Sequence, residues 1–369
     1  MTPEEISDAK AILSGVILHA VNLQKYSNGQ VRRILSILNR ADADIFAELQ
    51  RVLDNMPSGT ATSEYLFDML ASVRRLNAQA YSQIEGELTS NLRGLAEAEA
   101  TFQFNLYQGH APAGVTLAGV TAEQAWAAAY SRPFAGKLLR ESIAELGETR
   151  ARRIRDAVRM GYLEGRTTSQ IVRDIRGTRA KGYVEGFLEI DRRHLETMVR
   201  TAVQHTAGGV RDRFMEENAD VLESQLFVAT LDGRTSPPCI ARSGKRYTVG
   251  ERPKPIGHAV PWCTQFGCGP GRLHYNCRST AVGLLPGQTK LYGTRASANG
   301  PVDANMTYGA WLKGQPVAVQ DQVLGEKRAA LFRSGGLAID KFFNDKGQYL
   351  SLDQLRERDA AAFKRAGVN

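Results

Sequence analysis

Apolar residues recur at helical spacing through most of the first two-thirds of the chain. Between residues 6 and 23 they fall every three or four positions, which predicts an amphipathic helix. Thr2 and Glu5 form a capping pair at its start, and Asn28-Gly29 is expected to end it. Similar patterns predict further helices over about 30–55, 63–108, 121–149 and 191–218.

The pattern changes from helical to strand-like after residue 224. Residues 225–231 are β-branched and apolar, and the turn dipeptide Asp232-Gly233 follows them. Residues 243–249 are predicted to return as a hairpin, and residues 277–285 form a third strand. Three short strands are marginal by themselves, so this part of the chain is expected to need a further constraint.

These changes of pattern predict an α+β protein. Its N-terminal two-thirds is expected to be mostly helical, and a small antiparallel β subdomain and a mixed C-terminal tail follow. The predicted boundaries are a helical region at 1–108, a linker at 109–120, a helical Arg-rich part at 121–224, a Cys/His β subdomain at 225–287, a linker at 288–305 and a C-terminal extension at 306–369.

All four cysteines of the chain lie in the predicted β subdomain. Together with one histidine they form the candidate ligand set Cys239, Cys263, Cys268, His274 and Cys277. Zinc takes tetrahedral thiolate and imidazole ligands, and a closed zinc site stabilises the fold directly. Any three of the thiols with His274 would complete such a site, and either Cys263 or Cys268 would be the fourth ligand. A disulfide between those two, or plain buried thiols, remains an alternative.

The composition is that of a folded protein, with 43% hydrophobic and 23% charged residues, so a disordered chain is not indicated. The net charge of +8 favours a polyanionic partner. No apolar run approaches the length of a membrane span and the N-terminus lacks a secretory pattern, so we expect a cytoplasmic protein without membrane contact.

Arginines crowd the segment that follows residue 149. Dense arginines often form only a solvated face, but they also neutralise nucleic-acid phosphates without reading sequence. The predicted nucleic-acid contacts are Arg150, Arg152, Arg153, Arg155 and Arg159.

Several motifs in the β subdomain resemble those of a known family. The order "FVATLDGRTSPPC", "SGKRYTV" and "LHYNCRS", after the helix "VRTAVQHTAGGVRDRF", resembles the phage head morphogenesis family of minor head proteins, typified by the F protein of phage Mu. The family pattern has a CxxC pair and a closing His-Pro-x-Cys-Arg-Cys. In this chain Ser236 and Ser279 stand at two of those cysteine positions, and Tyr275 stands at the proline.

The resemblance implies a structural, non-enzymatic protein of a tailed phage. Such a protein would bind the portal protein, and it would also contact the major capsid or scaffold protein and the phage DNA backbone. It would reside in the capsid of the virion, and in the host cytoplasm during assembly. It would assist capsid assembly and DNA packaging or ejection, with a structural zinc. The alternative is a metal-dependent hydrolase, a nuclease or peptidase carried in the virion, with Asp232, His258 and His274 at its centre.

Overall fold

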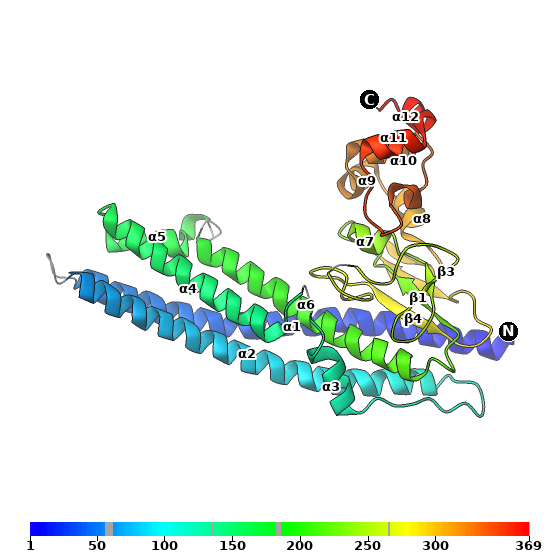
Figure 1. The fold of residues 1–369 in the computed structure, drawn as a ribbon, viewed down its shortest axis with the longest axis horizontal. Coiled ribbons are helices and arrows are strands. Elements are labelled where there is room, and N and C mark those ends of the chain that lie inside the picture. Colours follow the sequence, from blue (N-terminus) through cyan, green and yellow to red (C-terminus); the bar gives the residue numbers. More distant parts are fainter. Residues whose placement is uncertain (56–61, 134–135, 182–185, 265, 369) are drawn as a thin grey trace. The chain divides into compact units, whose positions relative to one another are not determined.

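The computed structural model describes residues 1–55, 62–133, 136–181, 186–264 and 266–368 (Figure 1). These residues form two compact units, each built from separated stretches of the chain. The sheet unit comprises Met1–Gln24, Leu95–Gly136 and Gln204–Asn369, and the bundle unit comprises Lys25–Gly94 and Lys137–Val203. Sequential domains with the predicted boundaries therefore do not describe the structure, because the long helices contribute residues to both units.

The described part of the chain is mostly helical, and its strands are short and antiparallel, which confirms the predicted α+β class. The helices are α1 (Pro3–Asp54), α2 (Thr62–Gln108), α3 (Ala122–Tyr130), α4 (Leu139–Leu163), α5 (Thr168–Arg176), α6 (Phe187–Glu217), α7 (Pro237–Ile240), α8 (Tyr308–Lys313), α9 (Val317–Leu324), α10 (Glu326–Arg333), α11 (Leu352–Arg358) and α12 (Ala360–Ala366), with 3-10 turns η1 (Arg179–Lys181) and η2 (Ile339–Phe342). The strands are β1 (Ser224–Val228), β2 (Arg246–Tyr247), β3 (Pro255–Ile256), β4 (Thr280–Leu284), β5 (Thr294–Ser297) and β6 (Gly300–Asp303).

A four-stranded sheet with the order β3-β2-β1-β4 is the centre of the sheet unit (Figure 1). The three strands predicted from the sequence are β1, β2 and β4, and β3 adds a short edge. β1 and β4 pair over their full length, from Ser224 opposite Leu284 to Val228 opposite Thr280. The end of β1 and the start of β4 therefore lie at the same edge of the sheet.

The two faces of this sheet belong to different hydrophobic clusters, because successive strand residues point to opposite sides. Leu226 and Val228 pack with residues of α1, α2 and α6, among them Ile12 and Phe214. On the opposite face, a small cluster is formed by Phe227, Ala229, Cys239, Tyr247, Trp262, Leu273, Cys277 and Ala281. The first face anchors the sheet to the helices, and the second carries the cysteines.

Tyr107 joins α2 to the sheet through one buried hydrogen bond. The backbone N–H of Gly283 in β4 donates to the Tyr107 hydroxyl oxygen at 2.8 Å, and the tyrosine side chain is fully buried. We expect Tyr107→Phe to destabilise the protein by about 1–3 kcal/mol, because it leaves that N–H without its acceptor. Chemical denaturation measures the change. The matched variant Tyr162→Phe alters an exposed tyrosine and should be neutral, so equal effects would contradict this assignment.

The C-terminal stretch packs around a core of its own within the sheet unit. Helices α8 to α12 surround Trp311, Leu312, Leu331, Phe342 and Phe363, and the turn after β1 contributes Leu231. The capping box that begins α11 joins Ser351 and Gln354. The tail is therefore a packed part of the sheet unit.

The bundle unit is held together by apolar residues of α1, α2, α4, α5 and α6. Its core contains Ile45, Leu49, Val73, Ile154 and Ile175. On α4 the buried positions are three or four residues apart, as expected for one face of a helix. These positions are Ile143, Gly147, Arg150, Ile154, Val158 and Gly161.

Several helix boundaries follow the capping chemistry predicted from the sequence. Thr121 with Gln124 begins α3 and Thr167 with Gln170 begins α5, each with a complete capping box. At the N-terminus, the backbone N–H of Glu5 donates to Thr2 Oγ1 at 3.2 Å, and the N–H of Thr2 donates to the Glu5 carboxylate at 2.7 Å. The predicted turn at 56–59 lies outside the described residues.

The predicted helix break at Asn28-Gly29 is wrong. α1 continues through these residues, although a glycine inside a helix costs about 1 kcal/mol relative to alanine. Val31 and Ile34 on the following turns are buried, and they keep the apolar stripe of the helix in register. Packing of this stripe outweighs the local cost of Gly29.

The two predicted linkers are packed segments of the sheet unit. In 109–120, Leu117 is buried, and its backbone N–H donates to the side-chain oxygen of Gln108 at 2.8 Å. The second segment, 288–305, contains the β5–β6 hairpin. There the Asn305 side chain exchanges two hydrogen bonds with the backbone of Leu291, at 2.9 and 2.8 Å. Tertiary contacts thus order stretches whose composition is typical of loops.

The expectation that no segment is long and apolar enough to cross a membrane is also wrong. By length and composition, α1 contains such a stretch. A core helix of a soluble protein meets the same criteria, and Ile12, Leu13 and Val16 of α1 are buried in the cluster beneath the sheet.

Candidate metal centre

Two loops at one edge of the sheet bring the candidate ligands together. The chain leaves β1, turns at Asp232 and enters α7, which carries Cys239. His274 and Cys277 lie in the turn that leads into β4. Because β1 and β4 are antiparallel neighbours, the loop after one and the loop before the other meet at that edge. Sheet topology, and not proximity in sequence, therefore assembles the cluster.

The cluster consists of two thiols and one imidazole. Cys239 Sγ lies 3.2 Å from His274 Nε2 and 3.6 Å from Cys277 Sγ, and the three candidate ligand atoms all lie within 4.8 Å of one another. Two sulfur atoms and one nitrogen atom form a donor set suited to zinc. The three residues have the geometry to hold a metal ion.

The turn that carries His274 and Cys277 is fixed by its backbone. The N–H of Cys277 donates to the carbonyl of His274 at 3.2 Å, and Asn276 between them has a φ of 56°. Asparagine is among the residues that tolerate this left-handed conformation. His274 Nδ1 lies 2.8 Å from the carbonyl oxygen of Tyr275. A proton on Nδ1 that donates to this carbonyl leaves the lone pair of neutral Nε2 facing the thiols, as a metal ligand requires.

Burial and mutual contact set opposite protonation preferences in the two thiols. Burial raises the pKa of Cys239 well above its usual range, and the hydrogen bond with Cys277 and the charge of that residue raise it further. Burial also opposes ionisation of Cys277, but hydrogen bonds from Cys239 and His274 and the charge of His274 lower its pKa well below that range. Burial alone would lower the pKa of His274, but the contact with Cys277 raises it.

Two arginines support the loops of the cluster. Arg242 is fully buried, and among the described residues it donates to the carbonyl oxygens of Pro261 at 2.8 Å, Pro238 at 2.8 Å and Cys263 at 3.2 Å. Arg278, next to Cys277, donates to both carboxylate oxygens of Asp232. Arg242 thus ties the helix of Cys239 to the segment around Cys263. Arg278 ties the turn of Cys277 to the turn that follows β1.

Cys263 and Cys268 are joined to each other in a disulfide, with their Cα atoms 4.1 Å apart. The prediction that one of them is the fourth metal ligand does not fit this structure, because neither sulfur is a free thiolate. The alternative disulfide is the arrangement observed. The local reason is that the strand bridge between Cys263 and Cys268 places the two backbones side by side.

The two serines at the altered positions of the motif lie at the cluster. Burial and Cys277 raise the pKa of Cys239, and the hydroxyls of Ser279 and Ser236 offset part of that rise. Neither was predicted as a site residue. Their spacing was the available indication, since Ser236 is three residues before Cys239 and Ser279 is two residues after Cys277.

The residues of the hydrolytic alternative have other partners. Asp232 is paired with Arg278. Burial opposes ionisation of Asp232, but the hydrogen bonds and charge of Arg278 outweigh burial and lower the pKa of Asp232. His258 Nε2 lies 2.8 Å from the carbonyl oxygen of Arg246, and its ring packs edge-on against Tyr247. Among the described residues, only Cys239, His274 and Cys277 form a metal-competent group of three or more His, Cys, Asp and Glu side chains. Asp232 and His258 are therefore outside the candidate centre.

The comparison with family models matches residues 152–282 to the family described as "Phage Mu protein F like protein". Over these residues the chain is similar to the Phage Mu F-like family. No curated protein and no solved structure matches the chain. This similarity to the Phage Mu F-like family suggests a protein of phage head morphogenesis. The match contains all three residues of the cluster.

The predicted nucleic-acid contacts on α4 differ in exposure. Arg150 lies just before the matched residues and is fully buried, where it forms an ion pair with Asp42 and donates to Asn77 Oδ1 at 3.0 Å. Its prediction as a DNA contact is wrong, because it occupies a position on the buried face of α4. Arg153 is half-buried and pairs with Asp191. Arg152 and Arg159 are exposed, and Arg155 is 43% exposed beside Asp156.

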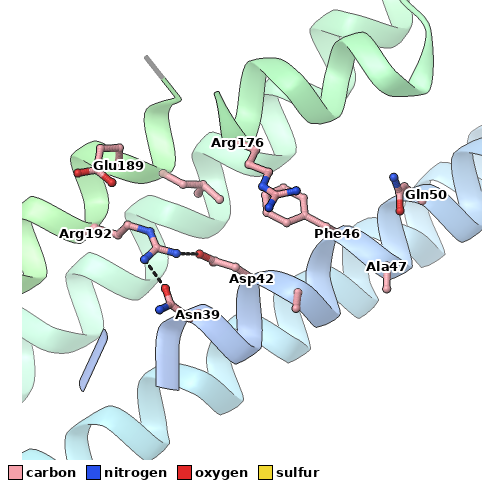
Figure 2. Close-up of a pocket in the computed structure, with 10 residues that line it drawn as sticks. Asn39, Asp42, Phe46, Ala47, Gln50, Arg176, Glu189 and Arg192 are labelled. Atoms are coloured by element: carbon pink, nitrogen blue, oxygen red, sulfur yellow. Dashed lines mark hydrogen bonds and ion pairs between the residues drawn. The ribbon is translucent and has the colours of Figure 1, made fainter. Parts of the chain in front are cut away.

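The bundle unit also has an open groove of about 540 Å³ between α1 and the start of α6 (Figure 2). The Arg192 guanidinium donates to the side-chain oxygens of Asn39 and Asp42 (Figure 2). The Arg176 guanidinium lies 5.6 Å from the centre of the Phe46 ring. The guanidiniums of the groove are thus engaged by other residues that line it, and we assign no binding chemistry to the groove.

Proposed function

We propose that this chain is a structural head morphogenesis protein of a tailed phage that binds the portal protein at its capsid vertex. The observation that carries the proposal is the match of residues 152–282 to the Phage Mu F-like family, with the Cys239, His274 and Cys277 cluster inside the matched stretch. Contact with the major capsid or scaffold protein belongs to the same proposal, as does a role in DNA packaging or ejection. The protein would be present in the host cytoplasm during assembly and in the virion afterwards.

We infer that a zinc ion held by Cys239, His274 and Cys277 stabilises the fold in this role. Zinc would supply a fixed link between the loop after β1 and the loop before β4. The chemistry of the donors supports this inference, as does the burial of both thiols, at 1% and 0% exposed. The chain's own residues prepare the link, because Arg242 and Arg278 hold the two loops and the Tyr275 carbonyl orients His274.

Portal binding is tested with assembled shells. The purified full chain is mixed with procapsids that contain the portal and, as a matched control, with procapsids of the same phage that lack it. We expect the chain to sediment only with the portal-containing shells. Equal sedimentation with both shells would indicate capsid or scaffold binding and contradict the portal assignment. Absence of the chain from purified heads and virions would contradict a structural role in the head.

Exposed arginines of α4 are proposed to contact the DNA backbone. We expect the double variant Arg152→Glu/Arg159→Glu to weaken binding of duplex DNA. It should also reduce the slope of log affinity against log salt by about 2, because each phosphate contact contributes about 0.9. The control Arg32→Glu/Arg33→Glu makes the same charge change at exposed positions of α1. Equal losses in both variants, measured by titration at several salt concentrations, would exclude a specific role for α4.

A further inference from the structure

Ser236 is an N-cap serine whose hydroxyl does not cap its helix. It is the N-cap residue of α7, and the backbone N–H groups of Cys239 and Ile240 both donate to its carbonyl oxygen at 3.0 Å. A serine at this position usually accepts a helix N–H with its hydroxyl, but Ser236 makes no such side-chain bond. Its hydroxyl oxygen is buried and has no hydrogen bond of normal geometry within the described residues. The hydroxyl is thus left available for another partner.

The Cys239 thiol is the functional group beside this hydroxyl. Ser236 and Cys239 are three residues apart across the first turn of α7, so their side chains lie on the same side of that turn. A buried polar atom without a hydrogen bond destabilises the fold. Its presence beside three candidate ligands therefore indicates a partner such as a metal ion or a water molecule.

The three protein donors leave one position of a tetrahedral ion to be supplied. The other two cysteines of the chain, Cys263 and Cys268, are joined in a disulfide. We propose that the fourth donor is an oxygen at Ser236, either its hydroxyl or a water molecule that the hydroxyl holds by a hydrogen bond. The complete set would then be two sulfurs, one nitrogen and one oxygen. This inference rests on the metal centre proposed above.

Cobalt(II) is the probe for this donor set, because its absorption reports how many thiolates coordinate it. The full chain is loaded with Co²⁺, and the intensity of its thiolate-to-metal charge-transfer band in the near ultraviolet is compared with that of Ser236→Cys. We expect an intensity typical of two coordinated thiolates in the unaltered chain and of three in Ser236→Cys. The Ser236→Cys variant should also bind Zn²⁺ more tightly than the unaltered chain. Ser236→Ala should bind Zn²⁺ roughly 10–100-fold more weakly, the usual loss when a group that supports a metal site is removed.

The double variant Cys263→Ser/Cys268→Ser is the matched control. Its cobalt band should equal that of the unaltered chain, with and without a thiol reductant, and circular dichroism checks that each variant is folded. If the unaltered chain shows three thiolates and the double variant shows two, a cysteine supplies the fourth ligand and the inference is overturned. An unchanged zinc affinity in Ser236→Ala would overturn it as well. A folded chain that binds neither Co²⁺ nor Zn²⁺ would contradict the metal centre itself.

Discussion

Replacing Cys277 by alanine is expected to abolish metal binding and to destabilise the sheet unit by more than about 4 kcal/mol, a loss typical of a removed metal ligand. For a unit of this size, that corresponds to a fall in melting temperature of roughly 8–16 °C. The metal would link two loops, because Cys277 lies in the turn before β4 and Cys239 lies in the helix after β1. Without Cys277 this link is lost. Differential scanning calorimetry of the metal-loaded chain measures the change.

The other pair of cysteines provides the control for this variant. Cys263→Ser/Cys268→Ser removes a disulfide that closes a loop with a sequence separation of 5. Loop-closure entropy predicts a cost of about 2 kcal/mol for so short a loop. Metal content should remain that of the unaltered chain. If this double variant loses the metal while Cys277→Ala keeps it, the assignment of the ligands is wrong.

Replacing Arg150 by alanine is expected to destabilise the bundle unit by about 3–5 kcal/mol. The substitution leaves the carboxylate of Asp42, which is 5% exposed, without its buried ion-pair partner. Arg192 also pairs with Asp42, but its side chain is 25% exposed. Arg192 is therefore expected to replace the lost partner only in part. Thermal or chemical denaturation measures the loss of stability.

A neighbouring arginine of the same helix separates this structural role from a role in DNA binding. Arg152→Ala removes an exposed guanidinium, and its effect on stability should stay within about 0.5 kcal/mol. If Arg150→Ala were as harmless as Arg152→Ala and instead weakened DNA binding, Arg150 would be a surface contact and the buried ion pair would be wrong.

Local chemistry allowed much of the fold to be predicted from the sequence. The capping pairs at Thr121 and Thr167 mark helix starts because a threonine hydroxyl and a glutamine three residues later satisfy local backbone groups. The strand pattern around β1 was equally local. The clustering of Cys239, His274 and Cys277 in sequence pointed correctly to a group of side chains that the sheet then brings together.

The incorrect predictions share a dependence on contacts distant in sequence. Gly29 does not end α1, because buried residues on the turns around it keep the helix packed. Residues 109–120 resemble a linker by composition, yet Asn218 accepts a hydrogen bond from the N–H of Ala118 at 2.7 Å, across 100 positions of the sequence. Such a contact leaves no pattern in a single sequence.

The spacing of the buried positions on α4 is sufficient to place Arg150 in the interior. Arg150 follows Gly147 by three residues and precedes Ile154 by four, so it continues the buried face of α4. A run of arginines alone predicts the surface for it, which is wrong for this position. The pairing of Cys263 with Cys268 was one of several alternatives, and only the bridge between their backbones decides it.

The central claim is that Cys239, His274 and Cys277 hold one structural metal ion. Its most direct test is the metal content of the purified full chain, combined with its melting temperature before and after treatment with a chelator. We predict about one zinc per chain, a large fall in melting temperature when the zinc is removed, and recovery when zinc is restored. A folded chain that contains no metal, and whose melting temperature is the same with and without chelator, would contradict the claim.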